Sequence, residues 1–195
     1  VQLVLGEVTK DSRNPLFIED KPWEVRFDNL YPSVIFDEDE GIFKCWYNPF
    51  IIDEAVASTP PEQRARLPYR VMRREMGVCY ATSLDGIVWE KPRLDIMEFQ
   101  GATANNLVLR QVHGAGIQKD LCDSDPQRRY KLFCKSGEKQ QPMAVAFSPD
   151  GLHWSKLWAC QEIEAAGDTH NNFFWDATRG RYIGITRLWR DHQRV

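Results

Sequence analysis

The 195-residue sequence lacks an excess of basic residues and lacks any long apolar run. Its 28 acidic and 25 basic residues give a formal net charge of -3 at pH 7. This balance provides no excess of positive charge with which to bind the phosphate groups of a nucleic acid. A membrane-spanning helix needs ~20 consecutive apolar residues, and the sequence has no such stretch. The composition therefore argues against nucleic-acid and membrane partners and predicts a soluble protein.

Cysteine is scarce and follows no metal-binding pattern. The five cysteines are odd in number, and none stands in a Cys-x-x-Cys spacing. The sequence thus supports neither a zinc site nor a complete disulfide framework, and we expect buried free thiols, no metal and no cofactor. No signal peptide is visible at Val1. Together with the odd cysteine count, this favours the cytoplasm over secretion.

One motif occurs twice in the chain. Ser83-Leu84-Asp85-Gly86-Ile87-Val88-Trp89 returns 65 residues later as Ser148-Pro149-Asp150-Gly151-Leu152-His153-Trp154. An Asp-Gly pair between alternating apolar residues is typical of a tight turn between antiparallel strands. Each copy is therefore predicted to be a hairpin, entered by strands at 78–82 and 143–147.

Counting back from these hairpins divides the chain into units of similar design. Each unit begins with a strand that ends in an acidic residue, and its second strand carries an aromatic residue; these are Asp37, Asp120 and Asp176, and Phe43, Tyr130 and Tyr182. Units in series that cannot bury their own faces are typical of propeller blades. We predict an all-β fold, a β-propeller of four-stranded antiparallel blades. An entry segment at 1–30 precedes three predicted blades, at 31–100, 101–160 and 161–195, of which the last is incomplete. The irregular stretch 48–74 is predicted to be an insertion with a short helix.

The residues just before and within the innermost strands would face the central funnel of such a fold. Polar candidates at these places are Glu24, Arg26, Asp28, Tyr31, Asn105, Asn106, His113, Asp168, His170 and Asn171. Glycoside cleavage needs one carboxyl group as acid and another as base or nucleophile, and Asp28 and Asp168 are the predicted catalytic pair, with Glu24 in reserve. Glu24 and the others are predicted to bind substrate. Turn formation is the alternative for the segment from Asp168 to Asn171, because Asp and Asn favour loops, and a structural role is the alternative for each histidine.

The two Ser-x-Asp-Gly-x-x-Trp copies resemble a hairpin of the five-bladed propeller glycoside hydrolases, the superfamily that holds families 32, 43, 68, 117 and 130. Tyr31-Pro32-Ser33-Val34-Ile35 resembles their opening Asp-Pro-Ser-x-Ile strand, and Asp168 with 173–176 resembles a later blade start. The resemblance implies five blades, of which about three are present, and hydrolysis of an oligo- or polysaccharide. It also assigns Asp168 to orienting the general acid, for which this chain offers no clear match.

The sequence departs from that pattern at one important place. Tyr31 stands where the superfamily has a catalytic Asp, so the role passes to Asp28 or is missing. A non-catalytic carbohydrate-binding or scaffold propeller is therefore the alternative to a glycosidase. The chain could also complete its ring by packing into an oligomer.

Overall fold

The computed structural model describes residues 3–27, 30–64, 66–67, 72–137, 143–165, 167–168, 170–191 and 193–194. Within these residues the fold is nearly all β, with one short helix, α1 (Pro61–Arg64), and one 3-10 turn, η1 (Pro126–Arg128). The predicted all-β class is confirmed, as is the short helix in the insertion. None of the described segments forms a helix with the length and hydrophobicity to cross a membrane.

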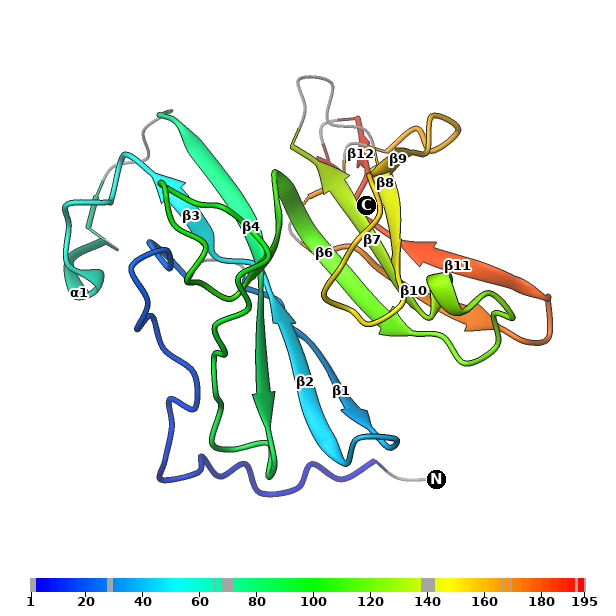
Figure 1. Cartoon of the computed structure of the whole chain (residues 1–195), viewed down its shortest axis with the longest axis horizontal. Helices are drawn as coiled ribbons and strands as arrows, with labels where there is room; N and C mark the ends of the chain where they lie inside the picture. Colours follow the sequence, from blue (N-terminus) through cyan, green and yellow to red (C-terminus); the bar gives the residue numbers. More distant parts are fainter. Residues whose placement is uncertain are drawn as a thin grey trace.

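The first sheet has five antiparallel strands (Figure 1). They are β1 (Ser33–Asp37), β2 (Ile42–Tyr47), β3 (Phe50–Asp53), β4 (Arg74–Ser83) and β5 (Leu107–Arg110). The ten-residue β4 extends beyond its pairing with β2, and β3 and β5 pair with that extension. This explains why a strand lies inside the stretch 48–74, which the sequence predicted to be irregular. It also places β5, within the predicted second unit, on the first sheet.

The second sheet is a four-stranded antiparallel meander. Its strands follow the chain in order as β6 (Val112–Lys119), β7 (Tyr130–Ser136), β8 (Met143–Ser148) and β9 (Trp158–Ala159). Two hairpins follow it, β10 (Asn172–Asp176) with β11 (Arg181–Ile185), and β12 (Trp189–Arg190) with β13 (Gln193–Arg194). The sequence predicted four-stranded antiparallel units; the structure has one antiparallel sheet of five strands and one of four.

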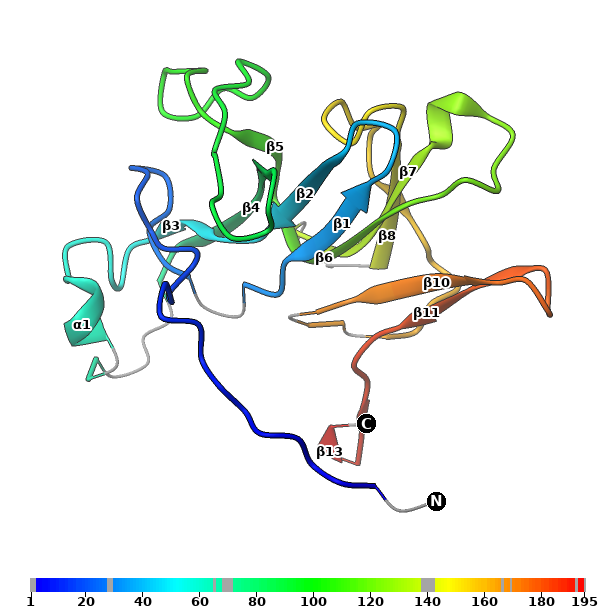
Figure 2. The ribbon, with the colours of Figure 1, turned by 90° about the horizontal axis from the view of Figure 1, so that it is seen from below.

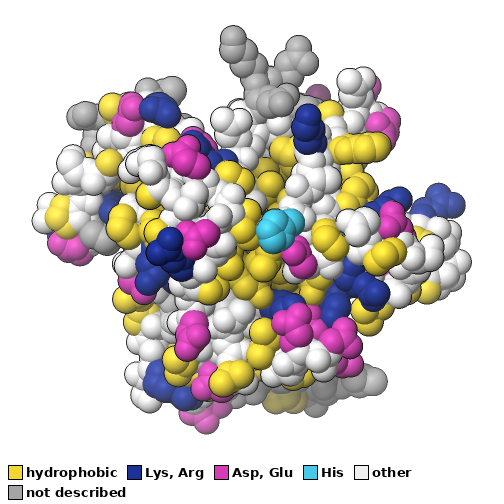
Figure 3. All heavy atoms as spheres, viewed as in Figure 1, with side chains coloured by type: hydrophobic (Ala, Val, Ile, Leu, Met, Phe, Trp, Pro, Cys, Tyr) yellow, Lys and Arg dark blue, Asp and Glu magenta, His cyan; other side chains and the backbone are white. Residues whose placement is uncertain are grey.

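The sheets pack on one another through their first strands. β6 lies against β1 and β4, and β10 lies against β6 and β7 (Figure 2). Trp46, Tyr80 and Leu132 belong to the core between the first and second sheets, and Phe133 and Phe173 to the core between the second sheet and β10. Hydrophobic side chains gather along the boundary between the first two sheets, flanked by acidic and basic groups (Figure 3).

The repeated motif forms a wider loop than the predicted tight turn. Gly86 and Gly151 adopt φ of 74° and 78°, but neither preceding Asp has positive φ, as a type I′ turn would require. Instead, Asp85 Oδ1 accepts hydrogen bonds from two backbone N–H groups at 2.8 Å each, and Asp150 does the same. These carboxylates therefore fix the conformation of their loops.

Acidic residues at the ends of the first strands tie neighbouring sheets together. Asp37 is buried, and it accepts hydrogen bonds from Lys119 at 2.7 Å and from the Tyr130 hydroxyl at 2.9 Å, while Lys44 pairs with it at 2.8 Å. Burial acts to raise the pKa of Asp37, but these cations and the hydroxyl outweigh burial and hold it well below its ordinary value. The same arrangement recurs one sheet further on, with Asp120, Lys131 and Tyr182.

Candidate functional site

The first group of predicted site residues lies inside the first sheet. Glu24 is buried, accepts a hydrogen bond from the Tyr47 hydroxyl at 2.7 Å and pairs with Lys91 at 2.8 Å. Asn106 is also buried and donates to the same hydroxyl at 2.7 Å. Asn105 is bound to backbone groups on its own loop. Their polar atoms therefore hold the N-terminal segment and the loop before β5 on the sheet.

The second group lies at a groove between β1 and β6. The rings of Tyr31 and His170 are in contact, with their centroids 5.2 Å apart. The groove has a volume of about 340 Å³ and is lined by the first residues of β1, the last residues of β6, His170 and Asn172. The predicted partner carboxylate, Asp28, lies outside the described residues. The structure thus brings Tyr31 and His170 together, with His170 lining this groove.

The third group gathers where β6 and β10 begin. Asp168 Oδ1 lies 3.4 Å from His113 Nε2, and Asp168 Oδ2 contacts the Arg187 guanidinium. Asn171 is fully buried and donates from its side chain to the Gly114 carbonyl at 2.8 Å and to the Asp168 carbonyl at 3.1 Å. Asn171 therefore fixes the segment that carries Asp168 against the start of β6.

A cleft opens beside this third group, between the first and second sheets. It has a volume of about 530 Å³. Its lining comes from β3, the start of β4, the start of β6 and the end of β7; it includes Phe50, Arg73, Arg74, Glu75, Gln111, His113, Lys135 and Ser136. Arg26, another predicted site residue, shares the buried Asp53 with Arg74, at 3.0 and 3.4 Å. Both guanidinium groups lie over the Phe50 ring, at 5.2 and 5.8 Å from its centroid.

The electrostatics of the cleft are set by burial and by crowded cations. Burial is the largest cause that lowers the pKa of His113 to about 4, and nearby Lys135 and Arg187 contribute in the same direction. Burial and Arg187 also lower the pKa of Lys135. His113 is therefore a neutral imidazole near pH 7, able to donate one hydrogen bond and accept another.

This arrangement suits the binding and orientation of a polar ligand. A neutral imidazole and a carboxylate next to each other can hold sugar hydroxyls, and the cations can stabilise negative charge. Both oxygens of Asp168 already face a partner, so its charge is compensated by Arg187. Asp168 is thus held in place by contacts on both of its oxygens.

Sequence reasoning missed several residues in or beside the cleft. Arg187 follows β11 in a stretch without a motif, and Lys135 occupies an ordinary strand position. The one visible signal was the pair of adjacent basic residues Arg73 and Arg74, where β4 begins. In the described part of the chain no group of three or more His, Cys, Asp or Glu side chains could hold a metal ion.

Comparison with known proteins gives little guidance. No family model matches the sequence, and no curated protein matches it. A crystal structure of an N-acetylgalactosamine deacetylase from F. plautii, in complex with blood group B trisaccharide, is similar with a TM-score of 0.41 and 15% sequence identity. The match covers 77% of this chain and 37% of that chain, so the chain spans well under half of the deacetylase's length.

Proposed function

We propose that the chain forms part of a carbohydrate-acting propeller that cleaves a glycosidic bond. The observation that supports this best is the cluster of His113, Asp168 and Arg187, which lies at the starts of β6 and β10 beside a cleft of about 530 Å³. Ligand pockets usually occupy ~300–1,000 Å³ and carry a few convergent polar groups. His113 lines this cleft, and Arg26 and Asp168, from distant parts of the sequence, each contact a residue of its lining.

The proposed architecture is a ring in which 31–100, 101–160 and 161–195 are successive blades after an entry segment. Strand register supports it, because Trp46 of β2 and Phe133 of β7 occupy the same position in the second strand of their unit, relative to the first strand with which it pairs. Each of the two side chains faces the next sheet. Ile185 of β11 holds the same place but is 59% exposed, and nearby Phe174 is 45% exposed. The outer face of β10–β11 is thus suited to pack on a further blade, or on a second copy of the chain.

The proposed roles follow from the placement of each residue. Asp168 orients a catalytic group or a sugar hydroxyl, and Asp28 is proposed as the second carboxylate of the mechanism. His113 and Arg26 bind substrate at the cleft, and Tyr31 and His170 bind it at the neighbouring groove. Four residues that the sequence predicted as substrate ligands instead support the site through the backbone segments that they anchor. They are Glu24, Asn105, Asn106 and Asn171.

Turnover of a panel of glycosides would test the proposal. Asp168→Asn and Asp28→Asn should each lower kcat/KM by about 100-fold or more, within the range that positioned acid–base groups contribute. Asp95→Asn is the matched control, because Asp95 is exposed and pairs with Arg93 far from the cleft. Unchanged turnover in Asp168→Asn would remove this residue from the mechanism.

A non-catalytic carbohydrate-binding propeller is the second candidate. It is favoured by Tyr31 at the place of the catalytic carboxylate and by the ion pair that already engages Asp168. Calorimetry that shows sugar binding, with no product by chromatography over the same panel, would select this candidate over the glycosidase.

A further inference from the structure

We propose that the cleft between β3–β4 and β6–β7 binds a sugar that carries an anionic group, a carboxylate or a sulfate. This inference rests on the proposed carbohydrate function and assigns its substrate class. Acidic sugars differ from neutral ones by one localised negative charge, and the cleft presents the groups that recognise such a charge.

The charged side chains that line the cleft in the described part of the chain are mostly cations. They are Arg73, Arg74 and Lys135 against a single carboxylate, Glu75. Glu75 is held from behind by Arg110 in a two-point ion pair, at 2.8 and 3.0 Å, which compensates its charge. The cleft is therefore positive, although the chain as a whole carries a net charge of -3.

The partners of these cations add to the positive character. Asp53 forms ion pairs with the guanidinium groups of both Arg26 and Arg74, so one negative charge is shared by two positive charges. On the other wall, burial and the nearby Arg187 lower the pKa of Lys135. Cations that crowd one another in a partly desolvated cleft are stabilised by an anion placed between them.

The types of residue match the shape of a carboxylate or sulfate group. A planar guanidinium binds such a group through two parallel hydrogen bonds, whereas an ammonium acts as a point charge. Arg73 and Arg74 on one wall and Lys135 on the other could thus hold one anionic group. Gln111, Ser136 and the neutral His113 line the same cleft and supply hydrogen-bonding groups for sugar hydroxyls.

Calorimetry with matched oligosaccharides tests the inference. The probes are a trisaccharide ending in glucuronic acid, its carboxyl-reduced glucose counterpart, and the same glucose trisaccharide with a 6-sulfate. The acidic or the sulfated sugar should bind at least tenfold more tightly than the neutral one, and that difference should shrink as salt is added. Comparison of the glucuronic acid probe with the sulfated probe shows whether the cleft prefers a carboxylate or a sulfate.

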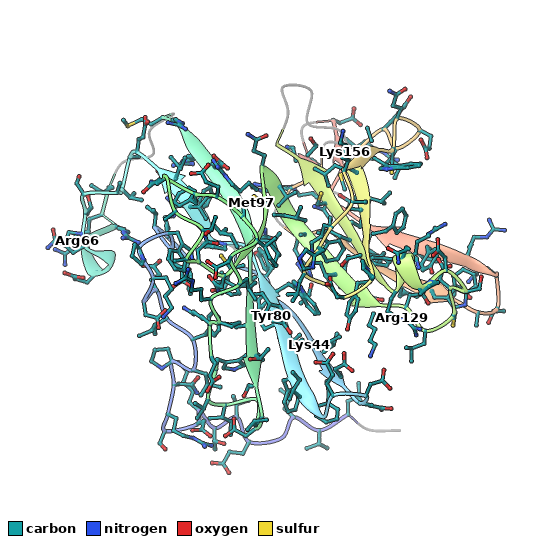
Figure 4. The ribbon with its side chains drawn as sticks, viewed as in Figure 1. Lys44, Arg66, Tyr80, Met97, Arg129 and Lys156 are labelled. Atoms are coloured by element: carbon teal, nitrogen blue, oxygen red, sulfur yellow. The ribbon has the colours of Figure 1, made fainter. Side chains whose placement is uncertain are left out.

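Two substitutions locate the charge recognition. Arg73→Gln and Lys135→Gln should each weaken binding of the preferred acidic sugar by about tenfold, the loss expected for one charge-assisted hydrogen bond. Arg66→Gln and Lys156→Gln are controls of the same chemistry on loops outside the cleft (Figure 4). Arg73 is exposed, so its variant tests binding without disturbing the core.

Three outcomes would overturn the inference. Equal binding of the neutral and acidic sugars would overturn it while leaving the proposed carbohydrate function intact. Charge-selective binding that the control variants weaken as much as the cleft variants would place the anion elsewhere on the protein. Binding of none of the sugars would overturn the inference together with the proposed function.

Discussion

The hydroxyl group of Tyr130 lies 2.9 Å from a carboxylate oxygen of Asp37, although 93 residues separate them in the chain. The bond crosses the boundary between the second and first sheets, where Lys44 and Lys119 also reach Asp37. A buried carboxylate of this kind is tolerated only when its partners compensate the cost of desolvation. The contact therefore fixes how the second sheet docks on the first.

Removing that hydroxyl should destabilise the fold. We expect Tyr130→Phe to lower the free energy of unfolding by about 2 kcal/mol, because a hydrogen bond to a charged group is lost. Urea denaturation followed by tryptophan fluorescence measures the change. Tyr80→Phe is the control, since the Tyr80 hydroxyl forms no hydrogen bond within the described part of the chain and should cost less than about 0.5 kcal/mol. Equal costs for the two variants would contradict the assigned role.

Gly116 allows β10 to approach β6 closely. A Cβ atom at this position would overlap the Asn171 carbonyl oxygen and lie 3.0 Å from Asn172 Cα. Gly116→Ala should therefore push the two strands apart and cost about 3 kcal/mol, in the upper range for overpacking. Gly184→Ala is the matched control on β11, because its nearest neighbour would be a Phe133 ring carbon at 3.4 Å. Thermal unfolding compares the two, and a Gly116→Ala protein as stable as wild type would refute the close packing.

The imidazole of His113 should titrate far below an ordinary histidine. Burial, Lys135 and Arg187 lower its pKa to about 4, so the folded state binds fewer protons than the unfolded state between roughly pH 6.5 and 4. His113 therefore costs stability progressively as the pH falls through this window. NMR titration of the histidine ring protons should give a midpoint near pH 4 for His113, and His113→Gln should reduce the loss of stability in acid. A midpoint above pH 6 would show that the ring is not desolvated as the structure indicates.

The five thiols should differ widely in reactivity. Cys45, Cys79 and Cys134 are buried, and burial raises their pKa values, to about 12 for Cys45 and Cys134, whereas Cys122 is exposed. A thiol reagent at pH 8 should modify Cys122 first and leave these three intact until the protein unfolds, because only the thiolate reacts. Mass spectrometry of the labelled peptides gives the order. All five should react in denaturant, and rapid labelling of Cys79 in native protein would contradict the burial.

Much of the fold could be predicted from local patterns. Alternating apolar residues and acidic turns predicted the strands now seen as β1, β2, β8 and the second half of β4, because side-chain period and turn chemistry are properties of short segments. The repeated Ser-x-Asp-Gly motif located corresponding loops in two sheets for the same reason. The strand β3 was missed because it forms by pairing with the part of β4 that extends beyond β2. No local sequence pattern shows how far β4 extends.

The candidate site was only partly visible in the sequence. Polar residues at the starts of inner strands were predicted to face a funnel. In the structure His113 lines a cleft, and Arg26 and Asp168 each contact a residue of its lining, Phe50 and His113. Glu24 and Asn106 fit the same sequence rule, yet the structure places them in buried hydrogen bonds. A polar side chain near a strand start faces either solvent or the interior, and the choice depends on which segment covers it.

The sequence by itself determined the all-β class, the repeated loops and the free cysteines, since each depends on residues close together in the chain or on composition. The tertiary structure alone decided where positive charge accumulates. Arg73 and Lys135 are far apart in sequence, and they line one cleft because the first two sheets pack against each other. Arg187 acts on Lys135 because β10 and its partner strand lie against the second sheet. Electrostatic interactions depend on distances in space, so a charged cleft can be identified only once the packing of the sheets has set the distances between its walls.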